Sequence, residues 1–196
     1  MTSHLLPTYK RQPISFTKGV GSYLYTADGT QYLDALTGIA VCGLGHCHPR
    51  ITAAISEQAA TLVHTSNLFL IDWQETAGKK LCNVAGMDRV FFANSGAEAN
   101  EAALKLARLI RPGKEILAFE DGFHGRTFGA MSATMQDKIQ NGFSPMVSGF
   151  SKAIYNDVDS LKASVTPQTG AILFEIVQGE GGVTPLTTEF AAALKS

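Results

Sequence analysis

The stretch that decides the fold is residues 94–108, NSGAEANEAALKLAR. It follows the apolar run Arg89–Ala93, whose aromatic bulk and sharp boundaries predict a buried strand. The stretch itself predicts a helix, because small and apolar residues recur on one face at helical spacing until Arg111-Pro112-Gly113 ends it. The expected packing face comprises Ala99, Ala102, Ala103, Leu106 and Ile110. The local unit is therefore a strand, a tight turn and a helix that approaches a sheet closely.

The start of this helix suggests an anion site. Ser95 is expected to cap the helix while Glu98 reaches back, as in a capping box, and Gly96 lets the backbone approach a ligand. Helix starts of this kind present free N–H groups and a positive dipole end, which hold phosphate in open α/β sheets. Ser95, Gly96 and Ala97 are therefore a candidate phosphate cup. A well-capped helix without a ligand explains the same residues, and Glu98 counts against an anion unless its carboxylate turns back onto the cap.

Composition and charge limit the function classes. The chain has 196 residues, of which 45% are hydrophobic and 17% are charged, as expected for a globular protein with a core. A net charge of −1 without a basic run indicates neither nucleic acid nor an anionic membrane surface as a partner, and favours a small molecule. We find no apolar run as long as a signal peptide or membrane helix requires, so we expect a cytoplasmic protein.

Cysteine and histidine do not predict a metal site. Cys42, Cys47 and Cys82 show no framework spacing, which agrees with reduced thiols. In His46-Cys47-His48, adjacent side chains cannot all point at one ion in regular backbone, and no second ligand pair with suitable spacing follows. A turn before Pro49 is the better interpretation of this cluster, and we expect no metal.

The remaining chain alternates strands with helices, which predicts an α/β fold with a mainly parallel sheet. The expected elements are a hairpin in residues 22–34 around Asp28-Gly29, helices from Pro49 and Asp72, and strands at Glu115–Phe119 and Ala171–Val177. Between the hairpin and the first helix, residues 36–45 contain too much glycine for a helix and too few large side chains for an ordinary strand. Such a stretch suits a buried wall beside a ligand.

Residues 94–108 resemble the phosphate loop and first large-domain helix of the class III aminotransferases, which are pyridoxal-phosphate enzymes of fold type I. The likeness runs from about Phe16 to Phe190 in the family's order and covers the first half of the family's length. It implies a truncated fold type I domain, with a mainly parallel sheet flanked by helices. Residues 1–70 would contain the N-terminal β-hairpin segment of the small domain, and residues 71–196 the first part of the large cofactor-binding domain.

The cofactor that the resemblance implies is pyridoxal 5'-phosphate, and Phe123 is a candidate for stacking on its ring. Phe123 follows the Glu115–Phe119 strand, at the end of a strand where α/β sheets bind ligands. On its own such a residue is more often part of the core. The segment Phe-His-Gly-Arg-Thr, which begins at Phe123, matches the family's segment with the stacking phenylalanine, and this implies a cofactor site that includes Phe123 and His124 along with the phosphate cup.

Candidate substrate residues follow from the same comparison. The guanidinium of Arg126 matches a carboxylate in bidentate geometry, and the resemblance implies that it binds the substrate α-carboxylate rather than lying on the surface. Glu175 and Glu180 resemble the glutamates of the family's Glu-Pro-Ile-Gln-Gly-Glu-Gly-Gly segment, which lie at the active site. Ile176 stands where many members have proline. A carboxylate within an apolar run is costly unless it is paired, so a buried pair partner is an alternative role for Glu175. Ile39 stands where ornithine-specific members tend to have tyrosine, and an apolar wall suits an acylated amine.

The implied reaction is amino-group transfer between N-acetylornithine and 2-oxoglutarate in arginine biosynthesis, by a homodimer that acts on small amino acids and 2-oxo acids. Ornithine, succinylornithine, 4-aminobutyrate and succinyl-diaminopimelate are alternative substrates, and a non-catalytic half-length chain is an alternative of another class. We expect no catalytic residue within these residues, because the family's Schiff-base lysine precedes a glycine pair in a later motif. The chain by itself is therefore expected not to transaminate.

Overall fold

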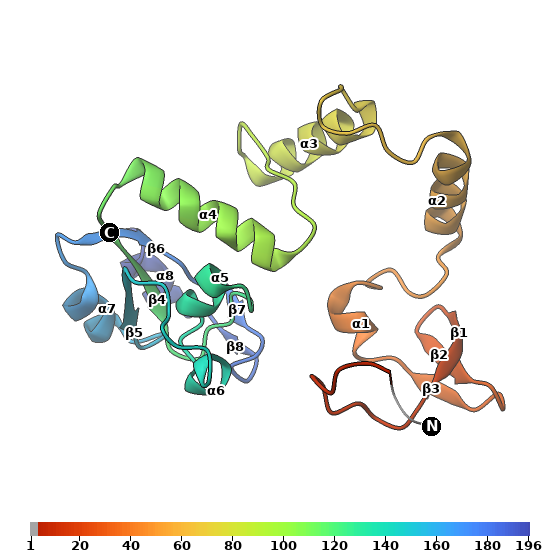
Figure 1. The fold of residues 1–196 in the computed structure, drawn as a ribbon, viewed down its shortest axis with the longest axis horizontal. Helices are drawn as coiled ribbons and strands as arrows, with labels where there is room; N and C mark the ends of the chain where they lie inside the picture. Colours follow the sequence, from red (N-terminus) through yellow and green to blue (C-terminus); the bar gives the residue numbers. More distant parts are fainter. Residues whose placement is uncertain (1–3) are drawn as a thin grey trace. The chain divides into compact units, whose positions relative to one another are not determined.

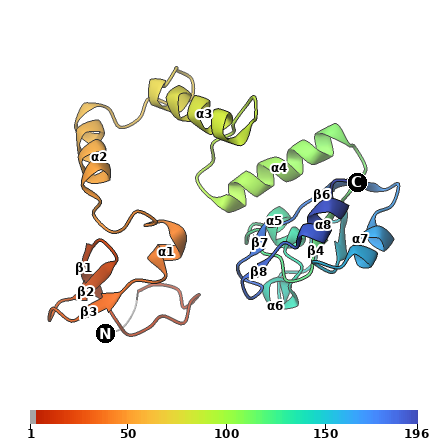
Figure 2. The same ribbon diagram turned by 180° about the vertical axis from the view of Figure 1, so that it is seen from behind.

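The computed structural model describes residues 4–196 and divides into two units (Figure 1). The first unit ends at Ala77, and the second runs from Gly78 to Ser196. All buried residues of the described chain belong to the second unit. Helix α3 (Asp72–Ala85) crosses the division between the two units. Figure 2 shows the same elements from behind.

The first unit contains a small antiparallel sheet with strand order β1-β2-β3. Its strands are β1 (Phe16–Val20), β2 (Tyr23–Thr26) and β3 (Gln31–Leu33). The predicted hairpin is confirmed by β2 and β3, which pair across a turn where Gly29 has φ +87°. Strand β1 was not expected from the sequence. The helices of this unit are α1 (Thr37–Ala40) and α2 (Pro49–Thr61), and the second confirms the helix expected from Pro49.

The glycine-containing stretch, residues 36–45, is mostly exposed in the described chain, so within this chain alone it does not form the expected buried wall. Its α1 turn is left-handed, with φ between 52° and 64° from Thr37 to Ala40, and the Ile39 side chain is 76% exposed. The stretch touches the sheet at its ends, where Gly21 and His46 exchange backbone hydrogen bonds of 3.1 and 2.7 Å. The Asp34 carboxylate lies 2.7 Å from His46 Nε2 across the base of this loop.

The second unit is built on a parallel sheet with strand order β5-β4-β6, which confirms the predicted sheet type. Its strands are β4 (Glu115–Phe119), β5 (Phe150–Ala153) and β6 (Thr169–Ile172). The crossovers contain α5 (Phe128–Ala133), α6 (Asp137–Gln140) and α7 (Val158–Ser164). A two-stranded ribbon, β7 (Val177–Gln178) and β8 (Thr184–Pro185), leads to α8 (Thr188–Ala193).

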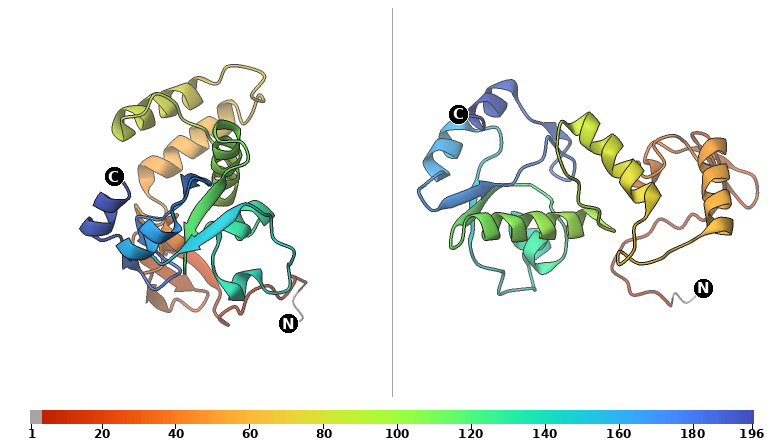
Figure 3. Two further views of the ribbon diagram at one scale, coloured as in Figure 1. Left: turned by 90° about the vertical axis from the view of Figure 1, so that its left-hand side faces the viewer. Right: turned by 90° about the horizontal axis from the view of Figure 1, so that it is seen from above.

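The core lies on both faces of the central strand β4. Leu117 and Phe119 pack with Ala153, Leu161 and Phe190, so α7 and α8 cover one face. Ile116 and Ala118 are also buried, and because side chains alternate along a strand they point to the opposite face. Helices α4 (Gly96–Ile110) and α5 lie on that side of the sheet (Figure 3). The sheet thus has helices on both faces, as in other open α/β folds.

Helix α4 has the predicted bounds but buries a different face. Leu104 is buried, and the half-buried residues are Ala97, Asn100, Glu101, Ala102 and Ala107. Of the predicted packing face only Ala102 is half-buried, whereas Leu106 is 55% and Ile110 62% exposed, so this face is wrong as predicted. The cause is that polar side chains of α4 bond to the loop after β4, which an apolar pattern cannot reveal.

The segment Arg89–Ala93 was predicted to be a buried strand, and this prediction is wrong. It forms neither helix nor strand, and Phe91 is 72% exposed. Among residues 4–196 no strand pairs with it. A strand requires a hydrogen-bonded partner, which apolar composition does not supply.

The predicted strand Ala171–Val177 is also interrupted. Strand β6 ends at Ile172, and Leu173 N–H still donates to Leu117 O at 2.8 Å. Beyond this point the Glu175 carbonyl accepts from the Tyr155 hydroxyl at 2.7 Å, and its carboxylate accepts from Phe123 N–H at 2.9 Å. Glu175 therefore lies in the connection between β6 and β7, not inside a strand as expected.

Candidate functional site

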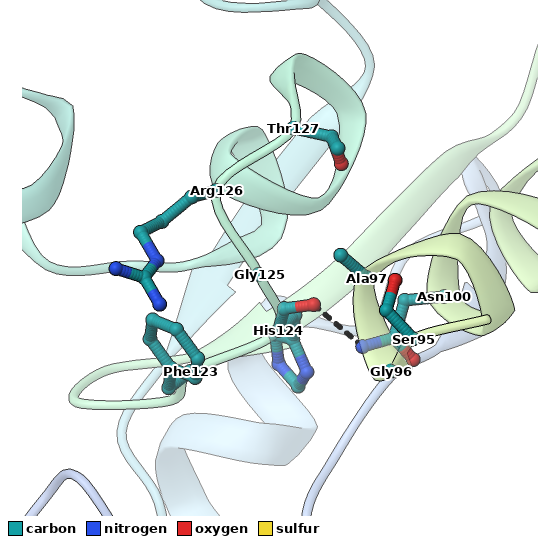
Figure 4. Close-up of a pocket in the computed structure, with 9 residues that line it drawn as sticks. All are labelled: Ser95, Gly96, Ala97, Asn100, Phe123, His124, Gly125, Arg126 and Thr127. Carbon is teal, nitrogen blue, oxygen red and sulfur yellow. Dashed lines mark hydrogen bonds between the residues drawn. The ribbon is translucent and has the colours of Figure 1, made fainter.

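A cavity of about 540 Å³ lies between the start of α4 and the loop after β4 (Figure 4). Its lining comprises Ser95, Gly96, Ala97, Asn100, Phe123, His124, Gly125, Arg126 and Thr127. Six of these were candidates from the sequence: the three of the phosphate cup, Phe123, His124 and Arg126. The other candidates, Ile39, Glu175 and Glu180, are not part of this lining. Figure 4 shows Arg126 and Phe123 on one side of the cavity and the helix start on the other.

The capping box at the start of α4 forms almost as the sequence suggests. Ser95 is extended, with φ −154° and ψ 161°, and its Oγ accepts from Glu98 N–H at 3.2 Å. The Glu98 carboxylate turns back, but it accepts from Asn94 N–H, at 2.6 Å, one residue before the cap. The N–H groups of Gly96 and Ala97 have no intrahelical acceptor at this position. The helix start is therefore available to an anion, and the Glu98 charge is already engaged by the backbone.

The aromatic side of the cavity comes from the loop after β4. Phe123 is half-buried and His124 is 4% exposed. Asn100 of α4 donates through Nδ2 to the His124 carbonyl at 2.6 Å, which joins helix and loop. Gly125, with φ +135°, lies so close to α4 that an added Cβ would be 2.8 Å from Ala97 Cβ. Only glycine fits between the two elements at this point.

Arg126 is exposed and lies beside the aromatic ring. Its Cζ is 5.9 Å from the centroid of Phe123, which is within the range of a cation–π contact. The next residue, Thr127, donates through Oγ1 to Glu101 of α4 at 2.5 Å, and the same carboxylate oxygen accepts from Ala130 N–H at 2.9 Å. Glu101 thus caps α5 and fixes the segment from which Arg126 projects.

The charges around the cavity follow from burial and hydrogen bonding. Burial lowers the pKa of the His124 imidazole to about 4, so this ring is neutral at pH 7. Burial alone would raise the pKa of Glu101, but hydrogen bonds from Thr127 and from the N–H groups of Ala130 and Gly129 outweigh it and hold this pKa below its ordinary value. The Arg126 guanidinium is the cationic group among the lining residues.

Glu175 acts on the loop rather than on the cavity. Its Oε2 accepts from Phe123 N–H, and burial raises the pKa of its carboxyl, opposed by the N–H groups of Phe123 and Gly179. The neighbouring Glu180 is exposed, and its negative charge raises the Glu175 pKa further. Ile39 belongs to the first unit.

Sequence reasoning missed three lining residues, Asn100, Gly125 and Thr127, and the supporting Glu101. A signal for the helix residues was present. Asn100 and Glu101 follow Gly96 and Ala97 by four positions, so they lie on the helix face that includes the cup. Polar residues one turn after an anion cup indicate that this face meets another polar segment.

A helix start facing an aromatic loop at the carboxyl end of a parallel strand is an arrangement that α/β enzymes use for phosphorylated cofactors. The family model described as Aminotransferase class-III matches residues 6–196. The chain belongs to the class-III aminotransferases, as the resemblance indicated, and has the fold type I architecture of its structural neighbours.

Individual relatives narrow the similarity. The chain is 53% identical over 192 residues to acetylornithine aminotransferase from Halalkalibacterium halodurans, covering 98% of this chain and 50% of the relative. It is 45% identical to the acetylornithine aminotransferase from Bacillus cereus, covering 100% of this chain and 51% of that protein. The chain thus spans about half the length of the curated relatives it matches.

Solved structures agree on the fold. The ornithine aminotransferase from Toxoplasma gondii superimposes with a TM-score of 0.92 at 32% identity, covering 98% of this chain and 48% of that one. The N-acetylornithine aminotransferase from Stenotrophomonas maltophilia gives a TM-score of 0.76 at 32% identity, covering 95% of this chain and 48% of that one.

The described residues form neither a membrane-spanning helix nor a metal-binding cluster. None of the helices formed by residues 4–196 has the length and apolar character needed to span a membrane. Over the same part of the chain, no three His, Cys, Asp or Glu side chains gather in a way that could hold a metal ion.

Proposed function

We propose that the native protein binds pyridoxal 5'-phosphate and transfers an amino group between N-acetylornithine and 2-oxoglutarate. The observation that supports this most directly is that the start of α4 and the ring of Phe123 border the same cavity. An anion cup and an aromatic face on opposite sides of one cavity suit a flat, phosphorylated ring.

The residues present fit this cofactor. The N–H groups of Gly96 and Ala97 and the Ser95 hydroxyl would hold its phosphate, and the Phe123 ring would stack on its pyridine ring. A neutral His124 beside them adds no competing charge. Bound pyridoxal phosphate would supply the electron sink that amino-group transfer requires. The chain's own contribution would be to orient the cofactor and to bind the substrate.

Substrate binding is assigned first to Arg126. Its guanidinium borders the cavity and can hold a carboxylate, which both the amino acid and the 2-oxo acid provide. The names of the relatives at 45–53% identity support N-acetylornithine as the amino donor. Ile39 remains a candidate for contact with the acylated side chain, and Glu175 and Glu180 remain candidates for the distal end of the substrate. Ornithine is the principal alternative, since a structural neighbour at 32% identity is an ornithine aminotransferase.

The proposed setting is a cytoplasmic homodimer. Large apolar side chains are exposed in both units, including Trp73 at 68%, Leu70 at 89% and Phe91 at 72%, and such surfaces are normally covered by further protein. Light scattering of the native protein at micromolar concentration should give the mass of a dimer, and an active monomer would refute this part of the proposal.

A pair of substitutions at Gly96 tests the phosphate cup. Proline is tolerated at the first position of a helix, and the extended Ser95 before it is compatible with proline, so Gly96→Pro removes one N–H donor without breaking α4. Gly96→Ala keeps the donor and is the matched control, because an added Cβ meets nothing within 4 Å. We expect pyridoxal phosphate to bind about tenfold more weakly to Gly96→Pro than to Gly96→Ala, as for loss of a charge-assisted hydrogen bond. Equal affinities would refute the cup.

Initial rates with 2-oxoglutarate and a panel of amino donors test the reaction. The donors are N-acetylornithine, ornithine, N-succinylornithine and 4-aminobutyrate. N-acetylornithine should have the highest kcat/KM. Higher kcat/KM with ornithine would assign the protein to the alternative substrate, and absence of transamination with all four would refute the proposed function.

A further inference from the structure

The loop that carries Phe123 is held by side chains from four different segments. Three carbonyls at the start of the loop accept from glutamine side chains: Gln178 donates to Glu120 O at 2.8 Å, and Gln136 donates to Asp121 O at 3.1 Å and to Gly122 O at 3.0 Å. Two loop N–H groups donate to side chains, Phe123 N–H to Glu175 at 2.9 Å and His124 N–H to Thr134 at 2.9 Å. The His124 carbonyl accepts from Asn100 at 2.6 Å. The last backbone hydrogen bond between the β4 end and β5 is Glu120 N–H to Ala153 O at 2.9 Å. Beyond Glu120 the side-chain contacts take the place of the strand-to-strand hydrogen bonds.

The loop needs such support because its backbone is both buried and irregular. Asp121 has φ +58°, in the left-handed region that non-glycine residues seldom adopt, and Gly122 is buried. A buried carbonyl without a donor carries a large desolvation penalty. The loop conformation therefore depends on donors that come from elsewhere in the chain.

Gln136 has a special place among these side chains. It is 5% exposed, and its single amide nitrogen, which has two N–H donors, reaches two successive carbonyls. The second of these carbonyls, Gly122 O, belongs to the same peptide unit as Phe123 N–H. This unit is thus held at its oxygen by Gln136 and at its nitrogen by Glu175. A planar peptide fixed at both ends sets the direction in which Phe123 leaves the backbone.

We propose that Gln136 is a positioning residue for the pocket: it clamps the Gly122–Phe123 peptide and so fixes the Phe123 ring against the cavity. The consequence for cofactor affinity rests on the proposed function, whereas the clamp itself does not. Gln136 does not line the cavity, so any effect it has on the cavity passes through the loop that carries Phe123.

Hydrogen exchange in the native protein without added cofactor tests the clamp. In Gln136→Leu, whose side chain has similar size but no donor, the amides of residues 122–124 should exchange about tenfold faster, since local opening becomes easier. The matched control is Gln140→Leu. Gln140 also donates from Nε2 to two carbonyls, Met131 O at 3.1 Å and Thr134 O at 2.9 Å, at the end of α5. It should leave exchange at Gly122 and Phe123 unchanged; His124 is left out of this comparison because its N–H donates to Thr134, which Gln140 contacts.

Titration with pyridoxal phosphate then tests the consequence. Gln136→Leu should bind it about tenfold more weakly than the wild type, equivalent to about 1.4 kcal/mol, and Gln140→Leu should bind it like the wild type. If Gln136→Leu does not fold, Gln136→Glu serves instead, because it has the same size and presents a carboxylate to both carbonyls.

The outcomes separate the two proposals. Faster exchange in the Gln136 variant together with weaker binding supports the positioning role. Unchanged exchange at Gly122 and Phe123 in a folded Gln136 variant, or equal acceleration of these two amides in Gln140→Leu, overturns it. A wild type that does not bind pyridoxal phosphate would refute the proposed function alone, because the exchange measurement does not depend on the cofactor.

Discussion

Removing the Glu101 carboxylate should loosen the turn that presents Arg126. One oxygen of Glu101 accepts from Thr127 Oγ1 and from Ala130 N–H, and the N–H of Gly129 also bonds to this carboxylate. In Glu101→Ala these donors lose their acceptor. Ala130 is fully buried, so its N–H stays unsatisfied, whereas Thr127 is exposed and can bond to water.

The size of the effect follows from these contacts. An unsatisfied buried N–H costs about 1–3 kcal/mol, and loss of a helix cap costs about 1 kcal/mol. Part of the Glu101 carboxylate is exposed to water, which weakens its interactions, so the sum is reduced accordingly. Glu101→Ala should then lower the free energy of unfolding by roughly 2–3 kcal/mol at pH 7. Urea denaturation of the native protein, followed by far-UV circular dichroism, measures this difference. Glu101→Gln retains an acceptor oxygen and should lose less.

The pH dependence has a definite sign. The folded pKa of Glu101 lies below its ordinary value, so its contribution to stability is fully present above the unfolded pKa, about 4.3. The contribution is lost as pH falls through the folded pKa. The difference between wild type and Glu101→Ala should therefore be constant from neutral pH to about pH 5 and shrink below about pH 4.

Gly129 gives a second, independent check. An alanine Cβ at this position would collide with the Glu101 carboxylate. Gly129→Ala should therefore destabilise the wild type, yet stabilise Glu101→Ala by up to about 1 kcal/mol through its higher helix propensity. The reasoning would be refuted by additive effects in the double variant, or by a Glu101→Ala stability within about 0.5 kcal/mol of the wild type at pH 7.

Further predictions concern the cavity and the exposed surface. Arg126→Ala should lower kcat/KM for the amino donor and for 2-oxoglutarate alike by about two orders of magnitude or more, while Arg50→Ala, a surface control, should change neither; unchanged kinetics would remove Arg126 from the site. Gly125→Val should weaken cofactor binding and stability together, because Cβ would press on Ala97 at a φ of +135°; a melting temperature equal to that of the wild type would contradict this. The 196-residue chain expressed alone should bind a hydrophobic dye and aggregate, because its apolar residues are widely exposed; a dilute, monomeric, dye-negative chain would disprove it.

The features that could be predicted from sequence are those decided by nearby residues. The Ser95 cap depends on a residue three positions later, and the hairpin depends on the turn at Asp28-Gly29, so both were visible in short segments. Phe123 was located because it follows an apolar strand whose carboxyl end faces the ligand side of the sheet.

The errors come from interactions between distant residues. Arg89–Ala93 has strand composition, but its state depends on a pairing partner that its own residues do not specify. The packing face of α4 was misjudged because Asn100 and Glu101 turn toward residues 24 to 29 positions later in the chain. The role of Gln136 could not be predicted for the same reason. Its side chain bonds to two backbone carbonyls, and a pattern of side-chain types does not show which carbonyls lie nearby.

The contact between Asp34 and His46 also affects the chain entropy of the exposed loop that it closes. The residues between them form a loop whose ends meet, in the length range of Ω-loops. Bringing together the ends of a free segment of this length costs on the order of 2 kcal/mol. In this structure the Asp34–His46 pair and the Gly21–His46 backbone hydrogen bonds already hold the ends together, so this entropy cost is met during folding and not during binding. A surface that covers Ile39 in the native protein therefore meets a loop whose ends are already joined, and loses less binding energy in ordering it.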